Sequence, residues 1–84
     1  MRLKENIAIS ESGFLFNPNT GESYSLNPSG REILKLISEG KDRDEIFRII
    51  QDAYSVSAQS LHRYLDDFLV LLQRFELIEL DEHE

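Results

Sequence analysis

The side chains in this sequence that could do chemistry are two histidines and many carboxylates. His62 and Asp66 are four residues apart, a spacing that places both on one face of a helix and could let them share a metal ion. A zinc site normally needs three or four protein ligands, but the sequence contains no cysteine and no histidine besides His62 and His83. The spacing therefore predicts a solvated ion pair, and no metal or other cofactor is expected.

Clusters of carboxylates occur at residues 42–45, 66–67 and 79–81, on predicted polar helix faces or at a helix N-terminus. A carboxylate becomes a general acid when burial or a close like charge raises its pKa, and the sequence indicates neither at these positions. The sequence also lacks a Gly-x-Ser-x-Gly motif and a glycine-rich phosphate loop. No catalytic residue is expected, so the sequence predicts a protein that is not an enzyme.

Net charge, chain length and composition limit the partners, the number of domains and the cellular location that can be expected. Nine Lys and Arg against sixteen Asp and Glu give a net charge of −7, which disfavours nucleic acid and anionic membranes as partners. The longest apolar run, 68–72, is far shorter than the ~20 residues of a membrane-spanning helix. The 84 residues predict a single domain, 1–84, with its core over about 6–80. The absence of cysteine and of a secretory signal favours the cytoplasm.

Alternating side chains predict three short strands between residues 6 and 26. The pairs that a period of two places on one face of a sheet are Ile7 and Ile9, Phe14 and Phe16, and Tyr24 and Leu26. Gly13 and the segment 17–21 are expected to form the turns between the strands, because glycine and asparagine tolerate positive φ. The result is a predicted three-stranded antiparallel meander.

Three helices are predicted over residues 28–77. Their expected starts are, in order, Asn27–Ser29, Asp42, and Ser55 or Ser57. The first helix is expected to end at Gly40 and the third at about Phe75. After the third helix the chain is expected to return to the core through Leu77, Ile78 and Leu80. Apolar residues form a stripe about 160° wide on the third helix, more than one core normally requires, which indicates contact with two surfaces. The stripe comprises Leu61, Tyr64, Leu65, Phe68, Leu69, Leu71, Leu72 and Phe75. Strands followed by helices predict an α+β domain in which the helices cover one face of the sheet.

Two features indicate a binding surface for a peptide or a protein. The strand 22–26 contains no proline or lysine to protect its edge, so another strand could pair with it. The wide apolar stripe of the third helix could form a wall beside that edge. The alternative is that Tyr24, Leu26, Tyr64 and Phe68 are core residues. DNA binding by a winged-helix shape is disfavoured, because the polar face of the third helix is neutral to acidic.

The stretch from Leu26 to Ile46 resembles the PqqD family, named after pyrroloquinoline quinone (PQQ) biosynthesis protein D. It has the family's Leu-Asn followed by a small residue and Gly, then an Ile-Leu-x-Leu helix, a break at Gly, and a second helix opening toward Glu-Ile. The resemblance covers roughly residues 7–80 and includes Phe16-Asn17 with Gly21, Phe68-Leu69 with Leu72, and Leu77-Ile78. Glu39 and Glu76 stand where the family usually has Asp and Gly.

The resemblance implies a recognition element for ribosomally synthesised and post-translationally modified peptides (RiPPs), a winged-helix-like domain that binds the leader of a precursor peptide. In the family, the leader pairs with the third strand, lies against the third helix, and is presented to a modifying enzyme, often a radical S-adenosylmethionine (SAM) enzyme. Carried over to this sequence, the strand edge comprises Ser23, Tyr24, Ser25 and Leu26, and the helix wall comes from some of Leu61, Tyr64, Leu65 and Phe68. The alternative is a non-catalytic winged-helix-like subunit that binds or regulates another protein without strand addition.

Overall fold

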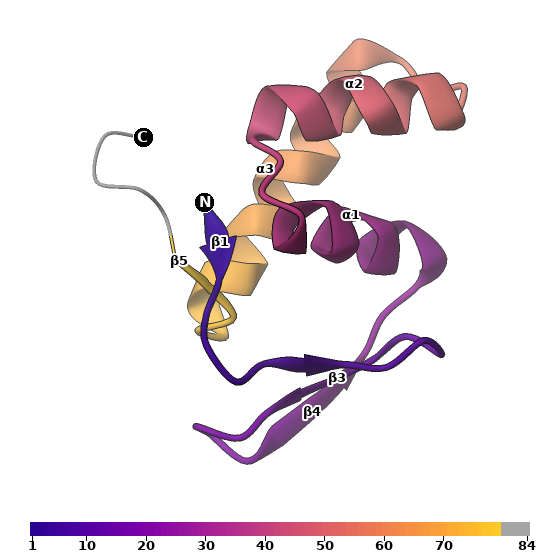
Figure 1. Ribbon diagram of the computed structural model, residues 1–84. Coiled ribbons are helices and arrows are strands. Elements are labelled where there is room, and N and C mark those ends of the chain that lie inside the picture. Colours follow the sequence, from indigo (N-terminus) through magenta and orange to yellow (C-terminus); the bar gives the residue numbers. More distant parts are fainter. Residues whose placement is uncertain (80–84) are drawn as a thin grey trace.

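A three-stranded antiparallel sheet forms the base of the molecule in Figure 1, a computed structural model that describes residues 1–79. β2 (Ala8–Ile9), β3 (Phe14–Asn17) and β4 (Glu22–Ser25) pair in the order β2-β3-β4, so β4 is an edge strand. In the turn between β3 and β4, Gly21 has a φ of 77°, a left-handed conformation that glycine adopts without strain. The predicted meander is confirmed.

Three helices follow the sheet and lie on one side of it (Figure 1). They are α1 (Pro28–Ser38), α2 (Arg43–Ala53) and α3 (Ala58–Arg74). The predicted α+β fold, a three-stranded antiparallel sheet followed by three helices, is confirmed. No helix within residues 1–79 is both long and apolar enough to cross a membrane.

Each helix begins after a polar side chain that accepts a hydrogen bond from the first turn, where the backbone N–H groups have no partner inside the helix. Asn27 Oδ1 accepts from the Gly30 N–H at 2.8 Å. Asp42 and Glu45 form a reciprocal capping box at the start of α2. Ser57 caps α3 in the same way as Asn27 caps α1. The helix starts expected within Asn27–Ser29 and at Asp42 are confirmed. Asn27 rather than Ser29 caps the first helix, and Ser57 rather than Ser55 caps the third.

The end of α3 turns sharply at Glu76, which has a φ of 59°. The Glu76 N–H donates to the Gln73 carbonyl, and the Leu77 N–H donates to the Leu72 carbonyl at 2.9 Å. This pair of bonds is a Schellman motif, in which a left-handed residue follows the helix. The position therefore suits glycine, which is usual here in the family that the sequence resembles. Glu76 adopts the same turn, but its Cβ raises the free energy of this backbone conformation.

A second, two-stranded sheet joins the chain's beginning to the segment after α3. β1 (Arg2–Leu3) pairs antiparallel with β5 (Ile78–Glu79), and Leu3 stands opposite Ile78. Leu77 and Ile78 are buried, so their predicted return to the core is confirmed; Leu80 lies outside the described residues. The sequence analysis did not predict β1, whose partner strand is more than seventy residues away.

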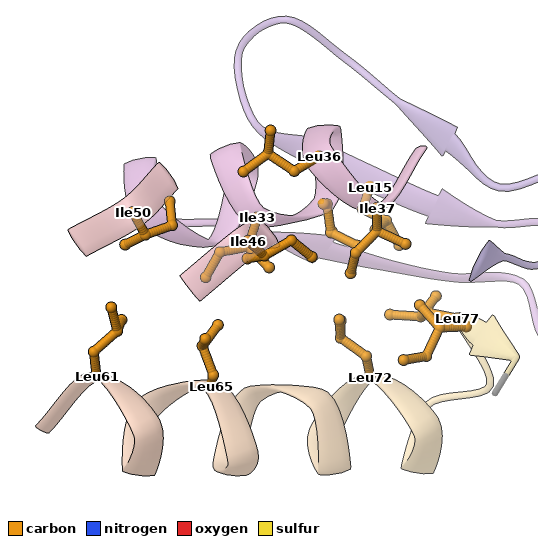
Figure 2. Packing of buried hydrophobic residues seen from close by; sticks show 12 residues of the cluster. Leu15, Ile33, Leu36, Ile37, Ile46, Ile50, Leu61, Leu65, Leu72 and Leu77 are labelled. Atoms are coloured by element: carbon orange, nitrogen blue, oxygen red, sulfur yellow. The ribbon is translucent and has the colours of Figure 1, made fainter. Parts of the chain in front are cut away.

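The hydrophobic core lies between α3, the other two helices and the sheet. Figure 2 shows Leu61, Leu65 and Leu72 of α3 pointing toward side chains of α1, α2 and β3. The largest side chains without appreciable exposure are Leu15, Ile33, Leu34, Ile37, Ile46, Leu65, Leu72 and Leu77. β3 therefore buries Leu15 toward the helices, and its neighbours Phe14 and Phe16 lie on the opposite face of the sheet, exposed.

One polar side chain, Asn17, is fully buried where the sheet meets the end of α3. Its Oδ1 accepts from the Asn19 N–H at 3.0 Å, and its Nδ2 donates to the Phe75 carbonyl at 3.5 Å. Its own carbonyl accepts from the Gly21 N–H at 2.8 Å. Asn17 therefore shapes the β3–β4 turn and holds that turn against α3, which fixes the position of β4 relative to the helix.

Candidate peptide-binding site

The outer edge of β4 carries backbone groups that no described strand pairs with. The Leu26 N–H donates to the Gly13 carbonyl at 2.8 Å, and Tyr24 stands opposite Leu15 in the β3–β4 register. Hydrogen-bonded and non-hydrogen-bonded residue pairs alternate along an antiparallel ladder. Since Leu26 is hydrogen-bonded to Gly13, just before β3, Tyr24 also directs its backbone N–H and C=O groups toward β3, and the two neighbours of Tyr24 direct theirs away from β3. The N–H and C=O groups of Ser23 and Ser25 are therefore presented at the free edge.

A row of four apolar side chains along α3 lies beside this edge. Three of these residues, Tyr64, Phe68 and Leu71, lie on α3, and the fourth, Phe75, is its C-cap residue. They follow one another at spacings of four, three and four residues, so they line one flank of the helix. We call these four residues the α3 row. The rings of Tyr64 and Phe68 stack with centroids 5.9 Å apart, and Leu71 is 41% exposed. The row is therefore partly open to a ligand.

Direct contacts join the α3 row to β4 and to the start of α1. The ring of Tyr24 stacks on Phe75 with centroids 4.8 Å apart. At the other end of the row, the hydroxyl groups of Ser29 and Tyr64 are 3.0 Å apart and hydrogen-bonded. The chain from β4 to α1 thus runs along the row in the opposite direction to α3, and the free edge borders the row.

The phenol of Tyr24 is held in its neutral form. Its hydroxyl donates to Glu22 Oε2 at 3.1 Å. Partial burial raises the pKa of Tyr24 above its ordinary value of 10, and the hydrogen bond and charge of Glu22 raise it further. The edge therefore offers a neutral, fixed aromatic side chain next to the unpaired backbone groups.

An apolar pocket of about 500 Å³ lies beyond the Tyr64 end of the row. It is formed where the start of α1, the end of α2 and the start of α3 meet, and its lining includes Pro28, Ile50, Val56 and Tyr64. Tyr54, also in the lining, donates its hydroxyl to Glu32 Oε2 at 3.0 Å, and this bond raises the pKa of Tyr54. The pocket has the size and lining that an apolar side chain of a ligand requires.

The structure separates the eight residues predicted for peptide binding into two groups. Six lie at the surface or partly exposed along the edge and the row: Ser23, Tyr24, Ser25, Leu26, Tyr64 and Phe68. Leu65 is 0% exposed and belongs to the core, so it has no surface to offer a peptide in this conformation. Leu61 is 3% exposed and reaches only the lining of the apolar pocket.

Leu71 and Phe75 complete the row, but the sequence analysis did not assign them to the site. The spacing of the α3 row is visible in the sequence, and both residues were placed in the apolar stripe of the helix. The periodicity gives the width of that stripe without showing which side of it faces the core. The contact between Tyr24 and Phe75 supplies this information.

The residues considered for metal binding are engaged in other contacts. Asp66 pairs with Arg43 at 2.6 Å rather than with His62, whose ring stacks on Phe47 at a centroid distance of 4.1 Å. The expected ion pair of His62 with Asp66 is therefore wrong: Asp66 forms its ion pair with Arg43 of α2 instead. Within residues 1–79, no group of three or more His, Asp or Glu side chains could hold a metal ion.

A small α+β domain with an open strand edge beside an apolar helix row has the geometry of domains that bind an extended peptide. The family described as coenzyme PQQ synthesis protein D (PqqD) matches residues 13–78. The chain belongs to the PqqD family, and the resemblance found in the sequence is confirmed.

Two solved structures share this fold. One, titled "TbiB1 in Complex with the TbiA(beta) Leader Peptide", is 32% identical, with a TM-score of 0.89 over 94% of this chain and 95% of that chain. The other, "Lasso peptide synthetase B1 complexed with the leader peptide", is 19% identical, with a TM-score of 0.79 over 90% and 93%. No curated protein sequence matches this chain.

Proposed function

We propose that this chain is a peptide chaperone, a RiPP recognition element that binds the leader of a ribosomal precursor peptide. The leader pairs as an additional strand with β4 and lies against the α3 row, and the domain presents it to a modifying enzyme such as a radical SAM protein. Membership of the PqqD family and the similarity to TbiB1, a protein whose structure contains a leader peptide, support this proposal.

The observation that carries the proposal is the unpaired backbone at Ser23 and Ser25 next to the α3 row. Backbone hydrogen bonds of an added strand contribute affinity with little demand on sequence, and alternate side chains that contact pockets contribute specificity. Tyr24 and Phe75 close one end of the contact, and the apolar pocket beside Tyr64 accepts a side chain of the leader at the other. The leader therefore needs an apolar residue at that position.

We propose further that residues 1–84 act as one peptide-binding domain, without catalysis of their own. The chemistry belongs to the enzyme that receives the peptide. We place this function in the cytoplasm, where a ribosomal precursor is made. The net charge of −7 supports a partner that is neither nucleic acid nor an anionic membrane.

Strand addition is tested by removing a single edge donor. In Ser25→Pro the proline ring replaces an N–H that faces away from β3, so the sheet of the free protein is retained. We expect the Kd for the precursor peptide encoded beside this gene to rise by about tenfold or more, through loss of the hydrogen bond and crowding of the added strand. Fluorescence anisotropy with labelled peptide measures the Kd.

The control is Ser25→Ala, which keeps the N–H and is expected to bind like the unchanged protein. Amide NMR spectra of both variants report whether the helices are intact, and Ser23→Pro repeats the test at the second edge donor. An unchanged Kd in folded Ser25→Pro and Ser23→Pro would exclude strand addition at β4. If the unchanged protein bound no peptide, the interaction-subunit alternative would be favoured. If it bound only duplex DNA, the charge argument against nucleic acid would be wrong.

A further inference from the structure

The face of the sheet that points away from the helices carries two exposed phenylalanines. Phe14 is 58% exposed and Phe16 is 44% exposed. They alternate along β3 with Leu15 and Asn17, which are fully buried. A shift of the strand by one residue would exchange the two sets, so the fold buries a leucine and an asparagine and leaves two larger aromatic side chains in solvent.

The residues around these rings are small and uncharged. The register places Ala8 and Ser23 on either side of Phe16, and it places Ser25 beside Phe14. Ser10, whose N–H donates to the Phe14 carbonyl at 2.8 Å, stands on the other side of Phe14. We call these six exposed residues the outer sheet face. The alanine and the three serines of this face are too short to cover the rings, and none of its six residues is charged, in a chain with 30% charged residues.

The outer sheet face is continuous with the edge at which the leader is proposed to bind. Ser23 and Ser25 belong to both, because their side chains point to the outer face and their backbone groups point to the free edge. A strand added to β4 would extend the face by one row, and every second side chain of the bound peptide would lie beside Ser23 or Ser25. A protein that covers this face would therefore contact the bound peptide as well.

We infer that the outer sheet face is the docking surface for the enzyme that modifies the bound peptide, with Phe14 and Phe16 as its anchors. Aromatic side chains at the centre of an interface contribute much of its binding free energy. The enzyme's contact patch is apolar at its centre and basic around it, since the domain carries a net charge of −7. A second copy of this chain carries the same net charge and is therefore a less favourable partner than a basic one.

This inference rests on the proposed function, and the test separates the two. The double variant Phe14→Thr/Phe16→Thr removes both rings and keeps residues that favour a strand. The matched control is Val70→Thr, which changes a side chain that is 53% exposed on α3, away from the sheet. Both proteins are titrated with labelled precursor peptide and, separately, with the purified modifying enzyme from the same gene cluster.

We expect the double variant to bind the peptide with a Kd within about threefold of the unchanged protein and to bind the enzyme at least about tenfold more weakly. Val70→Thr should bind both normally. Unchanged enzyme binding by the double variant would overturn the inference. So would an equal loss of peptide binding, or sedimentation showing a dimer of the unchanged chain that the double variant cannot form. Failure of the unchanged protein to bind peptide would overturn the proposed function instead.

Discussion

The two flanks of α3 are built differently. Toward α2, the helix makes specific polar and aromatic contacts, the ion pair Arg43–Asp66 and the stack of Phe47 on His62. Toward β4 it presents the α3 row, in which aromatic rings contact one another and Tyr24 but Leu71 remains 41% exposed. The flank toward α2 is covered by side chains of α2. The flank toward β4 lies next to the unpaired backbone groups of the strand edge. The wide apolar stripe of α3 thus contributes both to the core and to the partly exposed row at which we propose that the peptide binds.

The adjacent residues Leu65 and Tyr64 give the largest expected contrast between core and site. Leu65→Ala should lower the free energy of unfolding by about 2–5 kcal/mol, because it leaves a cavity at a fully buried position. Tyr64→Ala removes a partly exposed ring of the α3 row and should cost less stability, but it should weaken peptide binding by about tenfold. Urea unfolding and peptide anisotropy measure the two effects.

Tyr64→Phe serves as the control for that pair. It keeps the ring that stacks on Phe68 and removes the hydrogen bond with Ser29, so peptide binding should change only a few-fold, by about 1 kcal/mol or less. If Leu65→Ala weakened peptide binding more than Tyr64→Ala under conditions where both are folded, the division of α3 into a core side and a binding side would be wrong.

The sequence was sufficient to predict the features that depend on local rules. A cap at Asn27 or Ser29, a cap at Asp42, the turn at Gly21 and the helix break at Gly40 follow from the preferences of single residues. The structure contains all four features, with Asn27 as the first cap. The pairing of β1 with β5 could not be predicted in the same way, because it joins segments at opposite ends of the chain and each strand contains only two residues.

The orientation of side chains was harder to predict than the elements themselves. Alternation along β3 separates Phe14 and Phe16 from Leu15, but hydrophobicity alone would bury the phenylalanines. Similarly, periodicity groups Leu65 with Leu71 in one stripe, although the first is core and the second is exposed. In both cases the choice is made by packing against distant elements, which period and composition do not specify.

Gly30 gives a smaller effect on the binding flank. A Cβ at this position would lie 2.9 Å from the capping Oδ1 of Asn27 and 3.2 Å from the Phe68 ring. Gly30→Ala should therefore lower the free energy of unfolding by about 1 kcal/mol through the strained cap, although alanine is the better helix former. Because the Phe68 ring must also move, peptide affinity should fall about threefold.

Gly40→Ala is the matched control for Gly30→Ala. Gly40 has a φ of 87° and no atom near its missing Cβ, so alanine there is strained by the backbone alone. We expect a loss of stability of about 1 kcal/mol, similar to that of Gly30→Ala, with unchanged peptide affinity. Equal affinities for the two variants would show that the position of Phe68 does not matter to the ligand.

The smallest effect is expected on the flank toward α2. Asp66→Asn removes the charge that pairs with Arg43 at 2.6 Å, but Asp66 is 66% exposed, so water and salt screen the interaction. The free energy of unfolding should fall by about 0.2–1 kcal/mol at low salt, and the difference should shrink near 1 M salt, where the screening length is about 3 Å. Urea unfolding at both salt concentrations measures this. Peptide affinity should not change, because the Arg43–Asp66 contact lies across α3 from the row; a shift of more than about threefold would extend the site to both flanks.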